Sequence, residues 1–350
     1  MRGVNTIEAK LAQWEAHRCN TNAVVCISRA DRELKKWTKR SKQRKRDGDD
    51  EDQELQKTPR APPAGMLQGQ LHTTVLPTAI ASKTDRYYLV DKGRHMSARE
   101  TANAMGYRPD GRLKAVIGTT HKETGRLPAG ARTEMQAIAM QNEGMHVPTL
   151  RAVLRSGMPS MAHSERKVRL YDMCSGIGTM AEAVDQETGG NMEVVGAAER
   201  DARKRSILQE VWQDKGLKRA RIYVDALGED AADGPEADVF GMTPDCGKWS
   251  SASTVSEEEA MAETGKVKLM MRYATRKRPR MVVLESVATL LGNGRMRRCG
   301  EAIEAALRGA LPDYTWRAQI VDPWTHIGAP MRRERAFWVG TRPTATAQQP

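Results

Sequence analysis

Short apolar runs separated by longer amphipathic stretches are the dominant pattern of the chain from residue 167 onward. The runs read as β-strands at 168–172, 194–198, 221–224, 238–240 and 281–284. A helix is expected to open at 180–184, and two later apolar segments, 316–321 and 335–339, predict a hairpin. Short apolar strands that alternate with helices are typical of a parallel sheet with helices on both faces. The pattern therefore predicts an α/β fold with a mostly parallel sheet for the second half of the chain.

The stretch 81–160 is more polar but still carries signals for regular elements. Residues 87–90 are expected to form a strand. Ser97 is placed to cap a helix at 99–105, and a second helix is expected at 149–155, directly after a proline. We therefore expect this stretch to be folded.

Residues 1–80 have a different composition. A short amphipathic helix is expected at 7–17, but residues 35–46 include eight basic residues in twelve, and an acidic run at 47–54 and a proline-rich stretch at 59–63 follow. Blocks of like charge beside prolines are typical of disorder, so this region is predicted to be a largely disordered tail and linker. The basic block is interpreted either as a nuclear-targeting or phosphate-binding segment or as a solvated tail.

The formal net charge of the chain is +12. This charge favours an anionic partner, and nucleic acid is preferred over a membrane because no basic amphipathic helix with a bulky apolar face is visible. The five cysteines are scattered and form no CxxC pair, so no metal site is predicted and a reducing compartment is expected. No apolar run approaches transmembrane length. The expected location is intracellular: nuclear in a eukaryote because of the basic block, and otherwise the cytoplasm or nucleoid.

Side chains suited to ligand binding follow the predicted strands, where functional residues gather in parallel α/β folds. The turn at 175–178 holds two glycines, which let the backbone approach a ligand closely, but it lacks the third glycine of the dinucleotide fingerprint. Glu199 follows about twenty residues later, where a carboxylate can hold both hydroxyls of a ribose, and Asp225 is placed to accept from an adenine amino group. These features indicate an adenosine-bearing cofactor without a pyrophosphate. The candidate cofactor-binding residues are Asp172, Ser175, Gly176, Ile177, Gly178, Glu199 and Asp225.

Cys246 is the candidate nucleophile. It lies on the polar loop that follows the fourth predicted strand. A free thiol has a pKa near ~8.5 and attacks well only when that pKa is lowered, which Lys248 or the arginine cluster at 332–335 could bring about. A buried, inert thiol is the alternative interpretation of a cysteine taken alone.

Glu285 and two arginines complete the candidate chemistry. Glu285 ends the fifth predicted strand and would point into the same crevice as Cys246 if their strands are neighbours. Burial would raise its pKa, so that it can exchange a proton with a ring nitrogen. Arg333 and Arg335 are two residues apart on a strand-like segment, so they are expected to share one face and to bind an anionic or carbonyl oxygen.

Four segments stand in a fixed order along the chain: residues 172–178 (D-M-C-S-G-I-G), Pro244-Asp245-Cys246, residues 284–287 (L-E-S-V) and residues 328–335 (G-A-P-M-R-R-E-R). In that order they resemble four motifs of the C5-cytosine DNA methyltransferase family. Those motifs are the cofactor motif D-L-F-x-G-x-G, the nucleophile motif P-P-C-Q, the motif E-N-V and the motif G-V-P-Q-R-R-E-R. The resemblance extends over about half of the chain.

The resemblance implies a Rossmann-like, S-adenosylmethionine-dependent methyltransferase fold and a DNA (cytosine-5-)-methyltransferase activity. A cytosine would be flipped out of the duplex, Cys246 would attack C6 of its ring, and Glu285 would protonate N3. Arg333 and Arg335 would hold the O2 side, and the methyl group of S-adenosylmethionine would pass to C5. The resemblance also adds Pro244, and Arg200 as a stacking plane, to the residues expected at the cofactor.

Two further family motifs normally follow the arginine motif, but similar segments stand upstream here. Residues 96–102 resemble the family's T-P-R-E-x-A helix, and residues 144–148 resemble its G-N-x-V-P turn. This order implies a circular permutation, in which residues 81–160 pack on a methyltransferase core at 166–342. No long target-recognition region lies between the arginine motif and the upstream helix, so sequence specificity is expected to be weak or supplied by a protein partner.

Several supporting positions depart from the family motifs, and loose support weakens a site. Three alternatives therefore stay open: a catalytically weak or inactive nucleic-acid-binding relative, an enzyme that methylates cytosine in RNA, and an unrelated basic nucleic-acid-binding protein. The departing positions are Met145, Cys174, Arg200, Asp245, Gly247, Ser286 and Met331.

Overall fold

The computed structural model describes residues 24–26, 87–89, 94–108, 134–158, 166–214, 220–329 and 331–343. The chain divides into two compact units, the first made of residues 1–97 with 330–332 and the second of residues 98–329 with 333–350. The helix predicted at 7–17 and the charged and proline-rich blocks of the N-terminal region lie outside the described residues.

The first unit contains a small antiparallel sheet. Its strands are β1 (Val24–Cys26), β2 (Tyr87–Leu89) and β3 (Arg94–His95), in the order β1-β2-β3. The strand predicted at 87–90 is confirmed to within one residue. Strand β1 lies within the region that the sequence predicted to be largely disordered. The prediction missed this strand because its pairing partner β2 is about sixty residues away along the chain, a separation that local patterns do not reveal.

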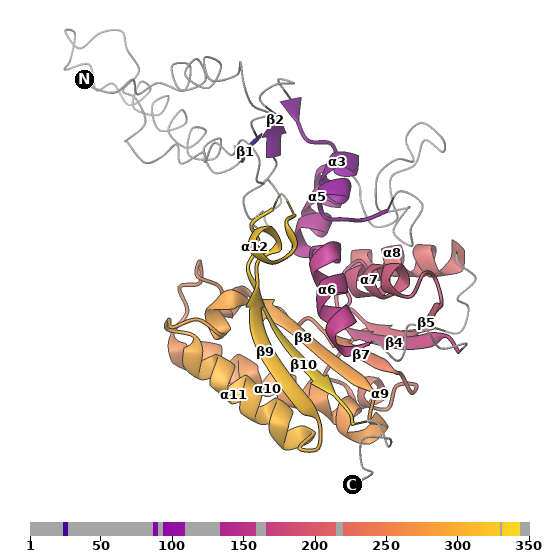
Figure 1. Ribbon diagram of the computed structural model, residues 1–350, viewed down its shortest axis with the longest axis vertical. Helices are drawn as coiled ribbons and strands as arrows, with labels where there is room; N and C mark the ends of the chain where they lie inside the picture. Colours follow the sequence, from indigo (N-terminus) through magenta and orange to yellow (C-terminus); the bar gives the residue numbers. More distant parts are fainter. Residues whose placement is uncertain are drawn as a thin grey trace, which may run out of the picture. The chain divides into compact units, whose positions relative to one another are not determined.

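The second unit is built on a seven-stranded sheet in the order β6-β5-β4-β7-β8-β10-β9 (Figure 1). All pairs from β6 to β8 are parallel, whereas β10 is antiparallel to both of its neighbours. This arrangement confirms the predicted α/β fold with a mostly parallel sheet. The strands are β4 (Val168–Met173), β5 (Met192–Ala198), β6 (Arg221–Tyr223), β7 (Val239–Met242), β8 (Met281–Val287), β9 (Thr315–Val321) and β10 (Arg335–Thr341).

One strand is longer than the sequence predicted. Strand β8 continues through Val287, so Glu285 lies inside the strand and not at its end. The reason is the antiparallel pairing with β10, in which Glu285 is opposite Phe337 and Val287 is opposite Arg335. The hairpin of β9 and β10 was predicted from its apolar pattern, and it is confirmed.

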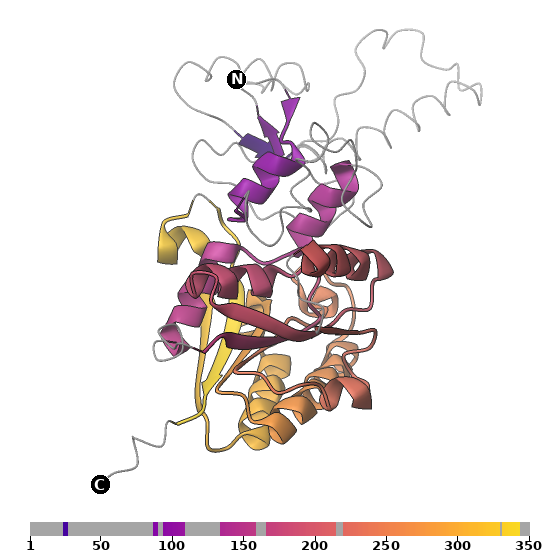
Figure 2. The ribbon, with the colours of Figure 1, turned by 90° about the vertical axis from the view of Figure 1, so that its right-hand side faces the viewer.

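Helices cover both faces of the sheet, as Figure 2 shows with the layers separated. The helices α6 and α7 lie on one face, and α10 and α11 pack together on the other. The helices of this unit are α3 (Ala98–Ala104), α5 (Glu134–Glu143), α6 (Val147–Gly157), α7 (Thr179–Glu187), α8 (Ala202–Asp214), α9 (Glu229–Ala232), α10 (Glu257–Lys277), α11 (Arg297–Ala310) and α12 (Pro323–Ile327). None of the helices in the described ranges is long and apolar enough to cross a membrane.

The core between the sheet and α10 holds a cluster of aromatic rings despite their scarcity in the sequence. The ring of Tyr171 lies 4.4 Å from that of Tyr273 and 6.0 Å from that of Phe240, measured between centroids. Trp249 and Trp338 are also buried in this cluster. Such large buried side chains contribute much of the hydrophobic stabilisation of a domain, so the strands that end at the site described below rest on a well-packed layer.

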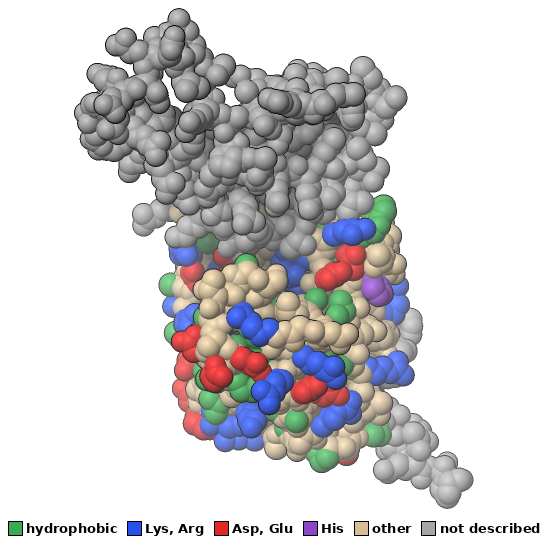
Figure 3. Space-filling view, turned by 90° about the vertical axis from the view of Figure 1, so that its left-hand side faces the viewer, with side chains coloured by type: hydrophobic (Ala, Val, Ile, Leu, Met, Phe, Trp, Pro, Cys, Tyr) green, Lys and Arg blue, Asp and Glu red, His purple; other side chains and the backbone are tan. Residues whose placement is uncertain are grey.

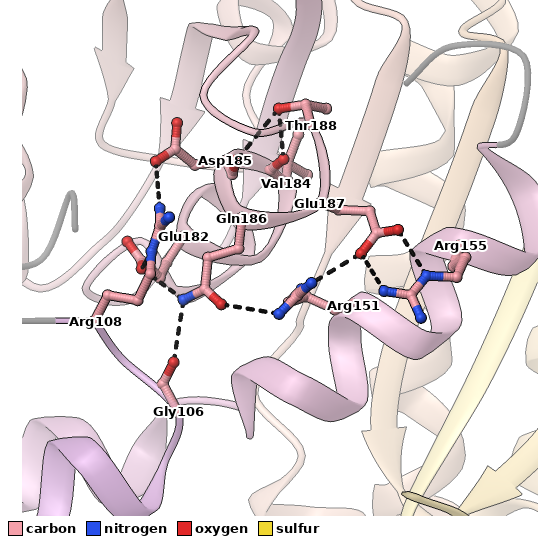
Figure 4. A network of polar contacts seen from close by, with 10 residues as sticks. All are labelled: Gly106, Arg108, Arg151, Arg155, Glu182, Val184, Asp185, Gln186, Glu187 and Thr188. Carbon is pink, nitrogen blue, oxygen red and sulfur yellow. Dashed lines mark hydrogen bonds and ion pairs between the residues drawn. The ribbon is translucent and has the colours of Figure 1, made fainter. Parts of the chain in front are cut away.

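The stretch upstream of β4 is docked on helix α7 by a network of polar contacts (Figure 4). Arg155 of α6 donates to both carboxylate oxygens of Glu187, at 2.8 and 3.0 Å. Arg108 donates to Asp185 at 2.9 Å, and the side chain of Gln186 donates to the carbonyl of Gly106 at 3.1 Å. Residues 144–148, and residues 98–102 of the other upstream segment, therefore belong to the same compact unit as the parallel sheet.

Candidate active site

The site lies where the strand order of the sheet reverses, between β4 and β7. The connections that follow β4 and β7 lead to opposite sides of the sheet, which opens a crevice at the carboxyl ends of these parallel strands. Thr243 joins the two loops that border it: its backbone N–H donates to the carbonyl of Met173 at 3.2 Å, and its hydroxyl donates to the carbonyl of Cys174 at 2.8 Å. The loop between β4 and α7 (residues 174–178, the glycine loop) is thus fixed to the loop that follows β7 (residues 243–246, the nucleophile loop, named for the candidate Cys246).

The glycine loop between β4 and α7 is held in shape by its own backbone. Cys174, Gly176 and Gly178 have φ angles of 60°, 58° and 88°, in the left-handed region that favours glycine. Ser175 ties the loop to the sheet, because its N–H donates to the carbonyl of Ala198 at 3.0 Å and its hydroxyl donates to the carbonyl of Asp172 at 2.6 Å. A Cβ added at Gly176 would meet no atom within 4 Å, so the loop is open at that residue.

Glu199 fixes the same loop from the end of β5. One carboxylate oxygen accepts from the N–H of Gly176 at 2.8 Å, and the other accepts from the N–H of Asp201 at 2.7 Å. Asp172 lies close by, fully buried, and burial together with the charge of Glu199 raises its pKa well above the usual range. The two carboxyl groups predicted from the sequence therefore lie together beside the glycine loop.

Two of the remaining cofactor candidates are exposed and two are buried. Asp225 is exposed, and its carboxylate accepts from the N–H of Leu227 at 2.9 Å. Arg200 is also exposed. Ile177, within the glycine loop, and Pro244, on the loop that follows β7, are buried.

The nucleophile loop follows β7 and turns into a short 3-10 helix, η3 (Gly247–Trp249). The N–H of Trp249 donates to the carbonyl of Cys246 at 3.0 Å, and its indole N–H donates to the carbonyl of Ala260 at 2.8 Å. The carboxylate of Asp245 accepts from the N–H of Gly247 at 3.0 Å. The buried indole thus anchors the loop and fixes the position of the partly exposed cysteine.

The thiol of Cys246 has a pKa raised to about 11. Burial is the main cause, and the charge of Glu285 adds to it, whereas Arg335 and Arg333 act in the opposite direction. Lys248 was predicted to help lower this pKa, but it is exposed and its ammonium binds Glu263 at 2.8 Å. The lowering that the sequence predicted is therefore not found, because burial outweighs the nearby positive charges.

The buried Glu285 forms an ion pair with the half-buried Arg335 near Cys246. The guanidinium Nε of Arg335 lies 3.0 Å from a carboxylate oxygen of Glu285. Burial raises the pKa of Glu285, while the charges of Arg335 and then Arg333 oppose the rise. Neighbouring strands β7, β8 and β10 thus bring a thiol, a carboxyl group with a raised pKa and a guanidinium to one place.

Arg333 departs from the arrangement that the sequence predicted. It precedes β10, so it does not continue the strand face of Arg335. Its N–H donates to the side chain of Asp322 at 3.2 Å, and one terminal nitrogen of its guanidinium donates to the carbonyls of Asn142 and Gly144. These contacts turn its guanidinium toward the upstream segment.

Several residues of the site were missed by the sequence analysis. The hydroxyls of Tyr107 and Thr179 share a hydrogen bond of 2.8 Å, and Lys204 binds Glu143 at 2.5 Å. Each pair joins the upstream segment to the core over a long sequence separation. Gly144 and Pro148 indicated the turn in the sequence, but no local pattern identifies the distant residues that the turn contacts.

Charges on the core are mixed. Lys and Arg side chains alternate with Asp and Glu on the face drawn in Figure 3. Across the described core many arginines pair with carboxylates, for example Arg276 with Asp233 at 2.9 Å and Arg308 with Glu304 at 2.7 Å. Within the described ranges, no three His, Cys, Asp or Glu side chains gather in a way that could hold a metal ion.

A protein-family model matches the part of the chain that carries this site. The model describes a C-5 cytosine-specific DNA methylase, and it matches residues 168–349, which is just over half of the chain. The chain belongs to the C-5 cytosine-specific DNA methylase family. It therefore carries a methyltransferase domain, and the upstream segment from α3 to α6 lies outside the matched region.

Solved methyltransferase structures are also similar to the chain. TrmN from Thermus thermophilus is 20% identical, with a TM-score of 0.38, and the similarity covers 57% of this chain and 49% of that chain. Precorrin-6y C5,15-methyltransferase from Geobacter metallireducens GS-15 is 12% identical, with a TM-score of 0.34, and 55% and 87% are covered. The chain thus spans about half the length of TrmN, and this likeness carries no conclusion about the substrate. No curated protein matches the chain.

Proposed function

We propose that this protein is a DNA (cytosine-5-)-methyltransferase that uses S-adenosylmethionine. The observation that carries the proposal is the meeting of Cys246, Glu285 and Arg335 at the edge of the sheet that also holds the glycine loop. A nucleophile, a proton donor and a binder of a carbonyl oxygen are the groups that addition to a pyrimidine ring requires.

The residues beside β4 and β5 fit an adenosine-bearing methyl donor. The open backbone at Gly176 leaves room for close approach of a ligand, and the buried acid Asp172 has a side-chain oxygen without a hydrogen-bond partner. Glu199 keeps acceptor capacity on both carboxylate oxygens beyond the two amides that it binds, which suits ribose hydroxyls. S-adenosylmethionine, when bound, supplies the methyl group. Ser175, Ile177, Gly178 and Pro244 shape its surroundings, and Arg200 and Asp225 border it from the exposed side.

In the proposed reaction a cytosine enters the crevice flipped out of its helix. The Cys246 thiolate forms a bond to C6, and Glu285 gives a proton to N3, so that C5 becomes the nucleophilic carbon. Arg335 donates to O2 and holds the ring. After C5 has taken up the methyl group, C5 loses its proton to a water molecule and the Cys246–C6 bond breaks. The proton on N3 then returns to the pair formed by Glu285 and Cys246, so that both groups regain the protonation state in which they started.

The raised pKa of Cys246 sets a condition on this reaction. With a pKa of about 11 the thiol is almost fully protonated at neutral pH. A substrate that takes the proton of Glu285 onto N3 leaves a carboxylate beside the thiol, which can accept the thiol proton directly or through water. Cysteine activation would then be coupled to cytosine binding.

We also propose that the family order is circularly permuted in this chain. The support is the packing of α6 on α7 and the hydrogen bonds of Arg333 to Asn142 and Gly144, which join the second upstream segment to the core.

Methyl transfer from labelled S-adenosylmethionine tests the proposal. Full-length protein would be incubated with mixed-sequence duplex DNA and, in a parallel arm, with RNA of the same sequence. Cys246→Ala is expected to lower transfer by at least ~10³-fold because no covalent adduct can form. Cys299→Ala, at a buried cysteine of α11 with no role in the proposed reaction, serves as the matched control. An oligonucleotide with 5-fluorocytosine at the target should trap the wild-type protein in a covalent adduct.

The outcomes separate the alternatives. Transfer to DNA that depends on Cys246 supports the proposal, and transfer to RNA alone would replace DNA with RNA as the substrate. Cofactor binding without transfer to either nucleic acid would favour an inactive, nucleic-acid-binding relative. Absence of cofactor binding by folded protein would refute the methyltransferase proposal as a whole.

A further inference from the structure

Arg333 is one of the most buried charged side chains of the described core, with an exposed fraction of 4%. A single terminal nitrogen of its guanidinium bridges two backbone carbonyls, at 2.9 Å from Asn142 and 2.8 Å from Gly144. These two hydrogen bonds tie the guanidinium to the turn that joins α5 to α6. Its charge also acts on Cys246 and Glu285, which lie beyond the turn.

This turn presses directly on the start of helix α7, which the glycine loop leads into. A Cβ added at Gly144 would come within 2.6 Å of the Tyr107 hydroxyl and 2.8 Å of the Thr179 hydroxyl. Those two hydroxyls are bonded to each other, and Thr179 directly follows Gly178, the N-cap of α7. A shift of the turn would therefore be transmitted to the glycine loop.

The turn is held on its other side as well. The carboxylate of Glu143 binds Lys204 of α8 at 2.5 Å, and the charge of Glu199 acts on that same lysine. His146, at the far end of the turn, is buried, and burial with the charge of Arg333 lowers its pKa to about 4. The imidazole is thus neutral near Arg333, so no second positive charge opposes the guanidinium.

We infer that Arg333 is a positioning residue for the cofactor, and that the contact with the cytosine falls to Arg335 alone. Arg333 fixes the turn at 142–146, and the turn fixes Thr179 and the glycine loop. The inference rests on the proposed methyltransferase function, because it assigns the two arginines of one motif to two different ligands. Arg335 instead faces Glu285 and Cys246, where the pyrimidine would lie.

These two assignments predict that substitution of Arg333 affects cofactor binding, whereas substitution of Arg335 affects kcat. Arg333→Met should raise the Kd for S-adenosylhomocysteine by ~10–100-fold, the loss expected for hydrogen bonds from a charged group, with kcat little changed at saturating cofactor. Arg333→Lys should recover part of the affinity, since an ammonium can reach at least one of the carbonyls. Arg335→Met should lower kcat and trapping by 5-fluorocytosine DNA by ~10²–10³-fold and leave the Kd for the cofactor product unchanged.

Three measurements on the full-length variants decide the matter: calorimetric binding of S-adenosylhomocysteine, kcat at saturating S-adenosylmethionine, and hydrogen exchange of peptides covering 136–150. Arg308→Met, at a surface pair on α11, is the matched control for loss of an arginine. Exchange in this segment should increase in both Arg333 variants and stay at the wild-type level in Arg335→Met. If Arg333→Met is poorly folded, Arg333→Lys carries the test.

Weakened cofactor binding with faster exchange in the Arg333 variants supports the inference. Wild-type cofactor affinity in Arg333→Lys and Arg333→Met, with kcat lowered as in Arg335→Met, would overturn it and place Arg333 at the cytosine. If the wild-type protein itself binds no S-adenosylhomocysteine, the proposed function fails, and this result is distinct from a failure of the Arg333 assignment alone.

Discussion

The candidate site at the carboxyl ends of the parallel strands has two halves, and each half contains a carboxylate that is held in a different way. In the half formed by β4 and β5, Glu199 is held by backbone N–H groups of Gly176 and Asp201. In the half formed by β7, β8 and β10, Glu285 is held by the guanidinium of Arg335. The first carboxylate is therefore part of a rigid backbone cradle, whereas the second sits in a buried ion pair that a substrate can rearrange.

The two cysteines of the edge show the same contrast. Cys174, on the glycine loop, has a pKa raised to about 12 by burial and by the acids around it, mainly Glu199 and Asp172. Cys246 has a pKa raised to about 11, because Arg335 and Arg333 offset part of the effect of burial and Glu285. Two guanidinium groups, those of Arg335 and Arg333, lower the pKa of Cys246, whereas Arg200 alone lowers that of Cys174. The surroundings therefore distinguish Cys246 as the proposed nucleophile.

Replacing each of the two carboxylates with an amide is expected to have the largest effect, and a different effect in each half of the site. Glu285→Gln is expected to lower kcat by ~10²–10⁴-fold, since it removes a proton donor, whereas Glu199→Gln should weaken cofactor binding and spare kcat at saturation. The pKa of Glu285 is raised, so its donating form exists below that pKa and is lost as pH rises through it. Wild-type activity should carry a corresponding falling limb with rising pH, and profiles of kcat/KM should lack this limb in Glu285→Gln. A limb retained in the variant would assign it to another group.

The link between the upstream segment and the glycine loop can be tested at Tyr107. Its hydroxyl is buried and bonded to Thr179, so Tyr107→Phe should lower the free energy of unfolding by ~1–3 kcal/mol, because the threonine hydroxyl is left unpaired. It should also weaken cofactor binding. Tyr273→Phe is the matched control, since that hydroxyl donates to the carbonyl of Pro235 on the opposite side of the sheet. Denaturant unfolding and cofactor titration measure both effects, and equal cofactor affinity in the two variants would show that the link is merely structural.

Alkylation rates sharpen the comparison of the two thiols. The pKa of Cys246 is raised less than that of Cys174, so Cys246 should have the larger thiolate fraction at any pH well below both values. Iodoacetamide labelling, followed by peptide mass spectrometry from pH 7 to 10, should therefore be faster at Cys246. Glu285→Gln should speed labelling of Cys246 because it removes a charge that raises the thiol pKa. Faster labelling of Cys174 would contradict the proposed order.

The smallest effect is expected at the surface of the docking network. Arg155→Ala removes an exposed ion pair with Glu187, and such pairs contribute about 1 kcal/mol or less. The loss should shrink further at high salt, because exposed charges are screened. Unfolding in low and high salt checks both points. A loss as large as that of Tyr107→Phe would mean that the exposed pair, and not the buried hydroxyls, holds the upstream segment.

Much of this architecture could be predicted from local patterns. Apolar runs at 168–172 and 281–284 predicted strands because a strand buried on both faces is apolar throughout, and the glycines at 176 and 178 predicted the cofactor loop because they permit φ angles that other residues avoid. Order along the chain was enough to pair Cys246 with a later glutamate and arginines. The fold class and the candidate residues were thus determined by the sequence alone.

Only the tertiary structure decided which of these residues lie together. The antiparallel pairing of β8 with β10 put Glu285 inside a strand and beside Arg335, and long-range contacts drew Arg333 away to Asn142 and Gly144. Burial, which depends on the whole fold, raised the pKa of Cys246 where local charges predicted a lower value. The physical reason is the same in each case: hydrogen-bond partners and desolvation are set by residues far away in sequence, and local patterns carry no information about them.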